Sequence, residues 1–128
     1  MILYQVESKK SLSDVARDFE AAVQKNKFGV LGVHDLKAKL KEKGVEFDRD
    51  CRVYEICNPH QAKKVLDRNM EISTALPCRV SLFSTDTGVA LATIRPTALL
   101  DLFKTPELAT VVREVEEVIV KIMDEAAR

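Results

Sequence analysis

Tryptophan is absent from the sequence, and aromatic residues make up only 5% of it. A hydrophobic core therefore has to be built mainly from aliphatic side chains. A net charge is missing as well, because 20 Lys and Arg residues balance 20 Asp and Glu residues. Without a net charge the chain has no overall field that would attract a phosphate backbone or an anionic membrane surface. We therefore expect neither nucleic acid nor membrane among its partners.

Long hydrophobic runs are absent too. The mostly apolar segment Met1–Val6 is far shorter than the roughly 20 apolar residues that a membrane-spanning helix needs. It is followed at once by Glu7, Lys9 and Lys10, which is the wrong order for a secretory signal peptide. These features predict a soluble protein that stays in the cytoplasm.

Cysteine is scarce, since the chain has only Cys51, Cys57 and Cys78. An odd number of cysteines in a chain large enough to fold without disulfides indicates free, reduced thiols. The length of 128 residues is close to the usual size of one domain. Because the sequence shows no repeat, low-complexity tract or linker, we expect a single domain over residues 1–128.

Familiar catalytic and cofactor motifs are missing. The sequence has no glycine-rich phosphate loop, no Ser-His-Asp set, no pair of metal-binding carboxylates and no patch of basic and aromatic residues. We therefore expect no cofactor. An enzyme is less expected than a non-catalytic protein, although missing motifs alone do not exclude catalysis.

Alternating and helical hydrophobic patterns predict the secondary structure. Strands are predicted at residues 2–7, 28–33, 51–57, 78–84 and 89–95, and the last two form a hairpin. Helices are predicted at residues 12–26, around Leu36 and Leu40 up to Gly44, at 59–69, and after Thr105-Pro106-Glu107. The order β-α-β-α-β-α-β-β-α indicates an α+β fold of two layers, in which helices cover a mixed or antiparallel sheet.

The last predicted helix has an unusually wide apolar face. Val118 and Val120 widen the stripe that Leu108, Ile119 and Met123 already form. A surface helix needs less apolar surface than this. Two interpretations stay open: the helix is sunk between the sheet and another element, or part of it forms a symmetric dimer interface.

The clearest candidate site is the junction Cys57-Asn58-Pro59, where a strand ends and a helix begins. Asn58 suits the N-cap and Pro59 the first helical position. Free backbone N–H groups at a helix N-terminus stabilise negative charge, so the junction could lower the pKa of the Cys57 thiol or hold a small anion. The alternative is that Cys57 is simply a small buried hydrophobic residue.

Two further arrangements involve the same thiol. Cys78, like Cys57, lies at a strand end beside a proline, and a close pair of cysteines could cycle between dithiol and disulfide. Cys57 and His60 have a C-x-x-H spacing, which Cys51, Cys78 and His34 could complete as a metal site. Structural zinc sites usually show two closely spaced ligand pairs, and only one pair is present here. We therefore expect no metal, with Cys57 and His60 as the only weak candidates.

Glu55 is the remaining candidate, because it alternates in step with Cys51, Val53 and Cys57 on the predicted strand 51–57. If that face points inward, Glu55 is a buried carboxylate with a raised pKa and belongs to a functional site. If the face points outward, Glu55 is an ordinary surface charge. The second interpretation is favoured because acidic residues are seldom fully buried.

Several landmarks occur in an order that resembles the domain of unknown function 302 family. They are Phe28-Gly29-Val30, a lysine-rich helix over 35–43, Cys57-Asn58-Pro59 with Ala62, and Leu76-Pro77-Cys78 before a hairpin strand. The resemblance implies a compact α+β fold of the TATA-binding-protein-like (TBP-like) type, often a homodimer, and it brings no activity. Glu55, Cys51 and His60 depart from the family pattern, so a site that relies on them is not expected to be general to the family.

The sequence as a whole predicts a non-catalytic domain that binds a small-molecule ligand or another protein. Candidate ligand-binding residues are Cys57, Asn58, Cys78 and Glu55. A homodimer is expected through the last helix or a sheet edge. The alternative is a thiol-dependent redox or metal-binding protein that uses Cys57 with Cys78 or His60.

Overall fold

A computed structural model describes residues 2–128 and contains one five-stranded sheet. The strands are β1 (Leu3–Ser8), β2 (Gly29–Asp35), β3 (Cys51–Cys57), β4 (Cys78–Ser84) and β5 (Val89–Ile94). They are ordered β1-β5-β4-β3-β2, and each is antiparallel to its neighbours. Of the two predicted kinds of sheet, mixed or antiparallel, the antiparallel one is observed.

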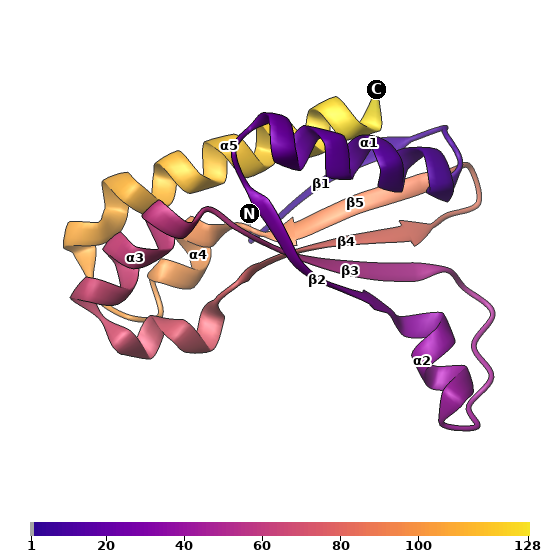
Figure 1. Ribbon diagram of the computed structural model, residues 1–128, viewed down its shortest axis with the longest axis horizontal. Helices are drawn as coiled ribbons and strands as arrows, with labels where there is room; N and C mark the ends of the chain where they lie inside the picture. The colour runs from indigo at the N-terminus through magenta and orange to yellow at the C-terminus, as the bar shows by residue number, and fades with distance from the viewer. Residues whose placement is uncertain (1) are drawn as a thin grey trace.

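Two long helices form the second layer of this α+β fold. α1 (Leu12–Lys25) and α5 (Ala109–Ala127) contact each other and lie across one face of the sheet (Figure 1). α1 begins as its sequence predicts, because the side chain of Ser11 accepts a hydrogen bond from the backbone N–H of Asp14. No helix within residues 2–128 is long and apolar enough to span a membrane.

The main hydrophobic cluster fills the space between these helices and the sheet. Tyr54 and Ile56 point from β3 into this cluster, and Phe19 of α1 meets the Tyr54 ring edge-on at a centroid distance of 5.0 Å. Side chains alternate between the two faces of a strand, so Glu55 points to the other face. That face carries exposed side chains, among them those of Leu3, Arg79 and Ile94.

Short helices gather at the end of the sheet where β3 ends and β4 begins. They are α3 (Pro59–Arg68), the 3-10 turn η1 (Met70–Ala75) and α4 (Pro96–Leu100), and a further 3-10 turn, η2 (Pro106–Leu108), leads into α5. A second hydrophobic cluster lies among them, with Val65, Ile72, Leu100, Leu108 and Val112 buried. The sequence prediction missed α4 and the two 3-10 turns, because each is too short to show a hydrophobic period.

These two clusters cover most of the wide apolar face of α5, although the half-buried Val120 belongs to neither. Leu108, the last residue of η2, and Val112 near the beginning of α5 belong to the second cluster, whereas Ile119, Ile122 and Met123 belong to the main one. The helix therefore packs against two groups of partners along its length. This agrees with the interpretation that α5 is sunk among other elements of its own chain.

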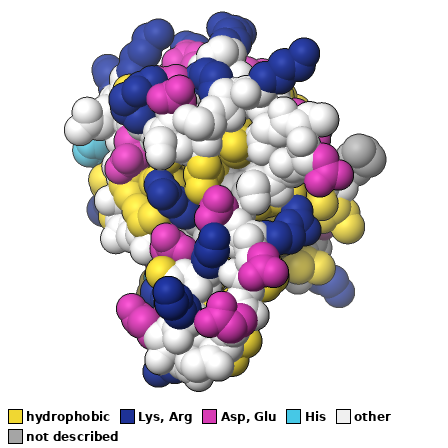
Figure 2. All heavy atoms as spheres, turned by 90° about the vertical axis from the view of Figure 1, so that its right-hand side faces the viewer, with side chains coloured by type: hydrophobic (Ala, Val, Ile, Leu, Met, Phe, Trp, Pro, Cys, Tyr) yellow, Lys and Arg dark blue, Asp and Glu magenta, His cyan; other side chains and the backbone are white. Residues whose placement is uncertain are grey.

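At the opposite end of the molecule, α2 (Leu36–Glu42) projects from the body (Figure 1). None of its residues is buried. The helix ends as predicted near Gly44, whose φ of +81° is a conformation that favours glycine. Figure 2 views the molecule from this end and shows Lys and Arg interspersed with Asp and Glu, with no large region of one sign on this face.

Candidate functional site

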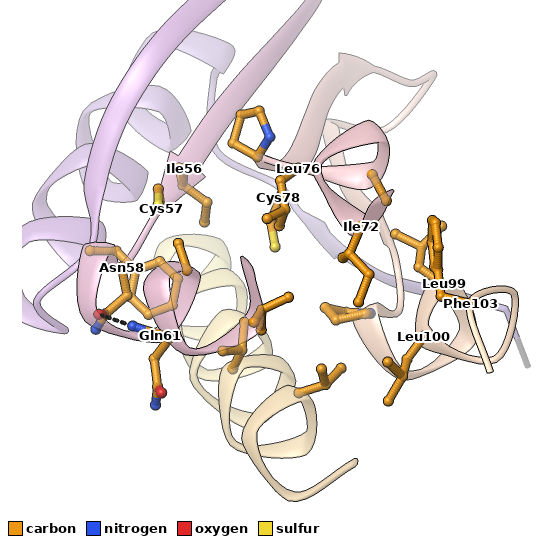
Figure 3. Close-up of a pocket in the computed structure, with 18 residues that line it drawn as sticks. Ile56, Cys57, Asn58, Gln61, Ile72, Leu76, Cys78, Leu99, Leu100 and Phe103 are labelled. Carbon is orange, nitrogen blue, oxygen red and sulfur yellow. Dashed lines mark hydrogen bonds between the residues drawn. The ribbon is translucent and has the colours of Figure 1, made fainter. Parts of the chain in front are cut away.

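An apolar cavity lies where the two hydrophobic clusters meet. Its volume is about 70 Å³, and its walls come from the ends of β3 and β4 and from α3, η1, α4 and α5. Members of both clusters line it, with Phe28 and Ile56 from the main cluster and Ile72, Leu100 and Val112 from the second. Figure 3 shows the lining side chains around the hollow, with Ile56, Ile72 and Leu100 among those labelled. A second hollow of about 330 Å³ lies beside it, and the two share Ala75, Pro77, Cys78, Pro96, Leu99 and Phe103.

Three of the four candidate ligand-binding residues line this apolar cavity: Cys57, Asn58 and Cys78. β3 ends at Cys57, and Cys78 is the first residue of β4, next to Ile56 in the sheet register. The antiparallel pairing of β3 with β4 therefore brings the two strand ends together. A cis peptide bond joins Leu76 to Pro77 just before Cys78.

The junction between β3 and α3 has the predicted geometry of a helix N-cap. The side-chain Oδ1 of Asn58 accepts hydrogen bonds from the backbone N–H groups of His60 (3.1 Å) and Gln61 (3.2 Å). Pro59 takes the first helical position, where it loses no helical hydrogen bond. Two of the free N–H groups at this helix end are therefore already satisfied by Asn58.

Both thiols at the cavity are weak acids. Burial raises the pKa of Cys57 above its ordinary value of 9.0. Burial, with a smaller contribution from Cys57, raises the pKa of Cys78 to about 11. The pKa of Cys57 thus moves in the direction opposite to the one that an activated thiol at a helix N-terminus requires. At neutral pH the two side chains are uncharged and contribute apolar surface.

Gln61 is a residue of the cavity wall that the sequence analysis did not single out. Its Nε2 donates a hydrogen bond to Glu114 Oε2 (3.5 Å), while its Oε1 is shielded from solvent. Within residues 2–128, this Oε1 is the one buried side-chain polar atom without a hydrogen-bond partner. The signal was Gln61 lying three residues after Asn58, the spacing of a capping box, although the structure shows no bond from Gln61 back to the cap.

The comparisons with known proteins fit this fold. The family model described as domain of unknown function DUF302 matches residues 4–126. The chain belongs to this family. The crystal structure of an uncharacterized conserved protein DUF302 from Bacillus stearothermophilus is similar to it, with 26% sequence identity and a TM-score of 0.94. That similarity covers 100% of this chain and 99% of the other. None of the curated proteins matches the chain.

Glu55 does not line the cavity of this DUF302 domain. It lies on the other face of the sheet, where its carboxylate accepts hydrogen bonds from His34 Nε2 (3.1 Å) and Arg79 (3.3 Å). Lys39 Nζ donates to His34 Nδ1 (2.8 Å). The hydrogen bond from His34, with a further contribution from Arg79, holds the pKa of Glu55 below its ordinary value of 4.5. Glu55 is thus an ion-paired surface carboxylate rather than a buried acid with a raised pKa.

The side chains considered for a metal site are dispersed over the molecule. His60 is exposed on α3, and His34 is hydrogen-bonded to Glu55 on the far face of the sheet. Cys51 lies on that same far face, with its sulfur 3.6 Å from Ser81 Oγ. In the part of the chain that the structure describes, residues 2–128, no three His, Cys, Asp or Glu side chains come together as a metal site.

Proposed function

We propose that this protein is a non-catalytic binding domain that takes up a small, uncharged, mainly apolar molecule in the apolar cavity. The observation that carries the proposal is the cavity lining, in which no side chain carries a formal charge. Ligand sites are concave, mostly apolar hollows with a few polar groups that set the orientation of the ligand. Asn58, Gln61 and the two thiols are the polar groups here.

The volume of the apolar cavity limits the part of the ligand that is buried in it to a small group. A water-sized group needs roughly 10–15 Å³ of such volume, so 70 Å³ holds about five non-hydrogen atoms. The neighbouring hollow of about 330 Å³ offers room for the rest of a longer molecule. The buried part is then the narrow end of the ligand.

The direction of the thiol pKa values supports this proposal over the thiol-dependent alternative. A redox or metal-binding cysteine acts as a thiolate, whereas burial raises the pKa of both Cys57 and Cys78. The homodimer and the cytoplasmic location stay predictions. Sedimentation equilibrium of the purified chain tests the first of them.

Xenon tests whether the cavity takes up an apolar guest, because xenon enters dry apolar cavities. We expect xenon pressure to shift the methyl NMR signals of Ile72, Leu100 and Val112, which line the cavity. Ala62→Leu places a larger side chain in the cavity wall and should abolish these shifts. Ala21→Leu adds the same atoms at an exposed position of α1 and should leave them unchanged. Identical xenon shifts in all three proteins would contradict the proposal.

A further inference from the structure

Four polar side chains form a row of hydrogen bonds on the face of the sheet opposite α1 and α5. Lys39 Nζ lies 2.8 Å from His34 Nδ1, and His34 Nε2 lies 3.1 Å from Glu55 Oε1. Arg79 donates to the second carboxylate oxygen, Glu55 Oε2, at 3.3 Å. These contacts join α2, β2, β3 and β4. Neither the apolar cavity nor the two hydrophobic clusters include any of the four except for the more distant hollow that Arg79 lines.

The local sequence explains how Lys39 and Glu55 both reach His34. β2 passes directly into α2 at Asp35, whose side chain caps the helix by accepting from the backbone N–H of Ala38 (3.0 Å). With the first turn fixed in this way, Lys39 lies within hydrogen-bond distance of His34. On the other side, a Cβ at Gly32 would lie 2.9 Å from Glu55 Oε1. The missing side chain of Gly32 therefore leaves the carboxylate room to approach His34.

The two partners of His34 fix the position of its proton. The ammonium group of a lysine can only donate, so His34 Nδ1 is the acceptor of the bond from Lys39. Nε2 then carries the proton and donates it to the carboxylate of Glu55, which can only accept. The lone pair of Nδ1 is thus turned toward Lys39, and this nitrogen is able to take a proton from it.

This geometry is the one that activates a nucleophile. A lysine reacts as a nucleophile only after its ammonium group has lost a proton, and the usual arrangement is a base within hydrogen-bond distance that a third group orients. Histidine exchanges protons near neutral pH, and the carboxylate of Glu55 stabilises the imidazolium that forms when His34 takes one. Lys39 is exposed, so a reagent from solution can reach it.

We propose that Lys39 is a reactive lysine that accepts an acyl group from a thioester, with His34 as its general base and Glu55 as the residue that positions His34. His34 Nδ1 takes a proton from the ammonium group, and the free amine attacks the carbonyl carbon of the thioester. A C–N bond forms and the C–S bond breaks. The leaving thiolate takes the proton from His34, and the second proton lost by the nitrogen goes to solvent. The products are an amide at Lys39, a thiol and one proton.

The acylation changes the chain once and has no turnover. A thioester suits the geometry because its leaving thiolate needs the proton that His34 has just accepted, so the base is restored at the end of the step. The site lies on the other face of the sheet from the main hydrophobic cluster. The inference therefore goes beyond the proposed function and does not depend on it.

The test follows acetylation of the purified protein by S-acetyl-N-acetylcysteamine at neutral pH, read lysine by lysine by peptide mass spectrometry. Lys41, which is exposed on the same helix, is the internal reference. A positioned general base contributes about 100-fold or more to a rate. If Lys39 occupies the bonded geometry for only a tenth of the time, it should still react about tenfold faster than Lys41. Equal rates at the two lysines would overturn the proposal.

His34→Gln tests the base. A glutamine can still accept a hydrogen bond from Lys39 and donate one to Glu55, but its amide does not take up a proton at neutral pH. Acetylation of Lys39 should therefore fall to the rate of Lys41, while the rate of Lys41 stays the same. Fast acetylation of Lys39 that persists in His34→Gln would show that His34 is not the base.

Glu55→Gln tests the positioning residue. Because Arg79 can only donate, it should hold the amide oxygen of the new side chain and leave the NH₂ group facing His34 Nε2. The proton of His34 then moves to Nδ1, which no longer accepts from Lys39. The imidazole nitrogen NMR signals of His34 should report this change of tautomer, and acetylation of Lys39 should slow with it.

The same NMR signals examine the unaltered protein. A proton on Nδ1 of His34 there would refute the proposal, because that nitrogen could not accept from Lys39. If Glu55→Gln slows Lys39 without changing the tautomer, the positioning role of Glu55 is wrong. None of these outcomes alters the xenon experiment, which reports on the apolar cavity alone.

Discussion

The protection of Cys78 from alkylation is the most direct quantitative consequence of the site. Iodoacetamide reacts with the thiolate, and burial raises the pKa of Cys78 from the ordinary 9.0 to about 11. At any pH well below 9, a shift of two units lowers the thiolate fraction about a hundredfold, because each unit corresponds to a factor of ten. We therefore expect Cys78 to be labelled at least about a hundredfold more slowly in the folded protein than in the unfolded one.

The assay is timed labelling of the native, reduced protein from pH 7 to pH 10, read residue by residue by peptide mass spectrometry. The same protein in urea supplies the reference rate for an accessible thiol. Cys57 should also lag behind its unfolded rate, because burial raises its pKa as well. Labelling of Cys57 that saturates well below pH 8.5 would refute this reasoning and would bring the thiol-dependent alternative to the front.

Two further predictions concern the sheet. In Gly88→Ala, the new Cβ would lie 2.0 Å from the backbone oxygen of Ser8, so we expect a loss of about 2 kcal/mol or more in urea unfolding. Gly29→Ala, which has no atom within 4 Å of the new Cβ, is the control and should change stability by less than about 0.5 kcal/mol. For Glu55, the folded pKa lies below the ordinary 4.5, so its stabilising contribution is present above that pH and is lost as the pH falls through the folded pKa. Glu55→Gln should therefore be less stable than the unaltered protein near pH 6, with a difference that shrinks as the pH falls through the folded pKa of Glu55, and a difference that does not change with pH would contradict the ion-pair assignment.

Much of the fold could be predicted because its elements are long or sharply bounded. The predicted limits of strand 51–57 are the observed ones. Its β-forming residues run up to Asn58 and Pro59, which suit the N-cap and the first position of a helix and so end the strand. The α5 helix shows its apolar stripe over many turns, and two clusters are needed to bury it. In contrast, α4 spans only Pro96–Leu100, which is too short for a period to be read from its sequence.

The candidate site was only partly accessible to sequence reasoning, for a different reason. Cys57, Asn58 and Cys78 carry local signals, because a strand end and an N-cap are visible in a few residues. Glu55 carries the same period-two signal as Cys57, and only the position of the helices decides which face of the sheet is covered. Gln61 is a polar residue on a helix with no local sign that its oxygen is shielded by groups far away in the sequence.

The location of the cavity follows from how the two layers differ in length. α1 and α5 are long enough to cover the middle of the sheet, and the main cluster there contains side chains with no exposed surface. Beyond the end of the sheet, α5 continues against short elements only, namely α3, α4 and η2. Each short element contributes few side chains. These do not fill the space between the two clusters, and the apolar cavity lies there. Such elements also open locally at a lower free-energy cost than a central sheet does, so the ligand that we propose would enter past them, opposite the wall that the ends of β3 and β4 form.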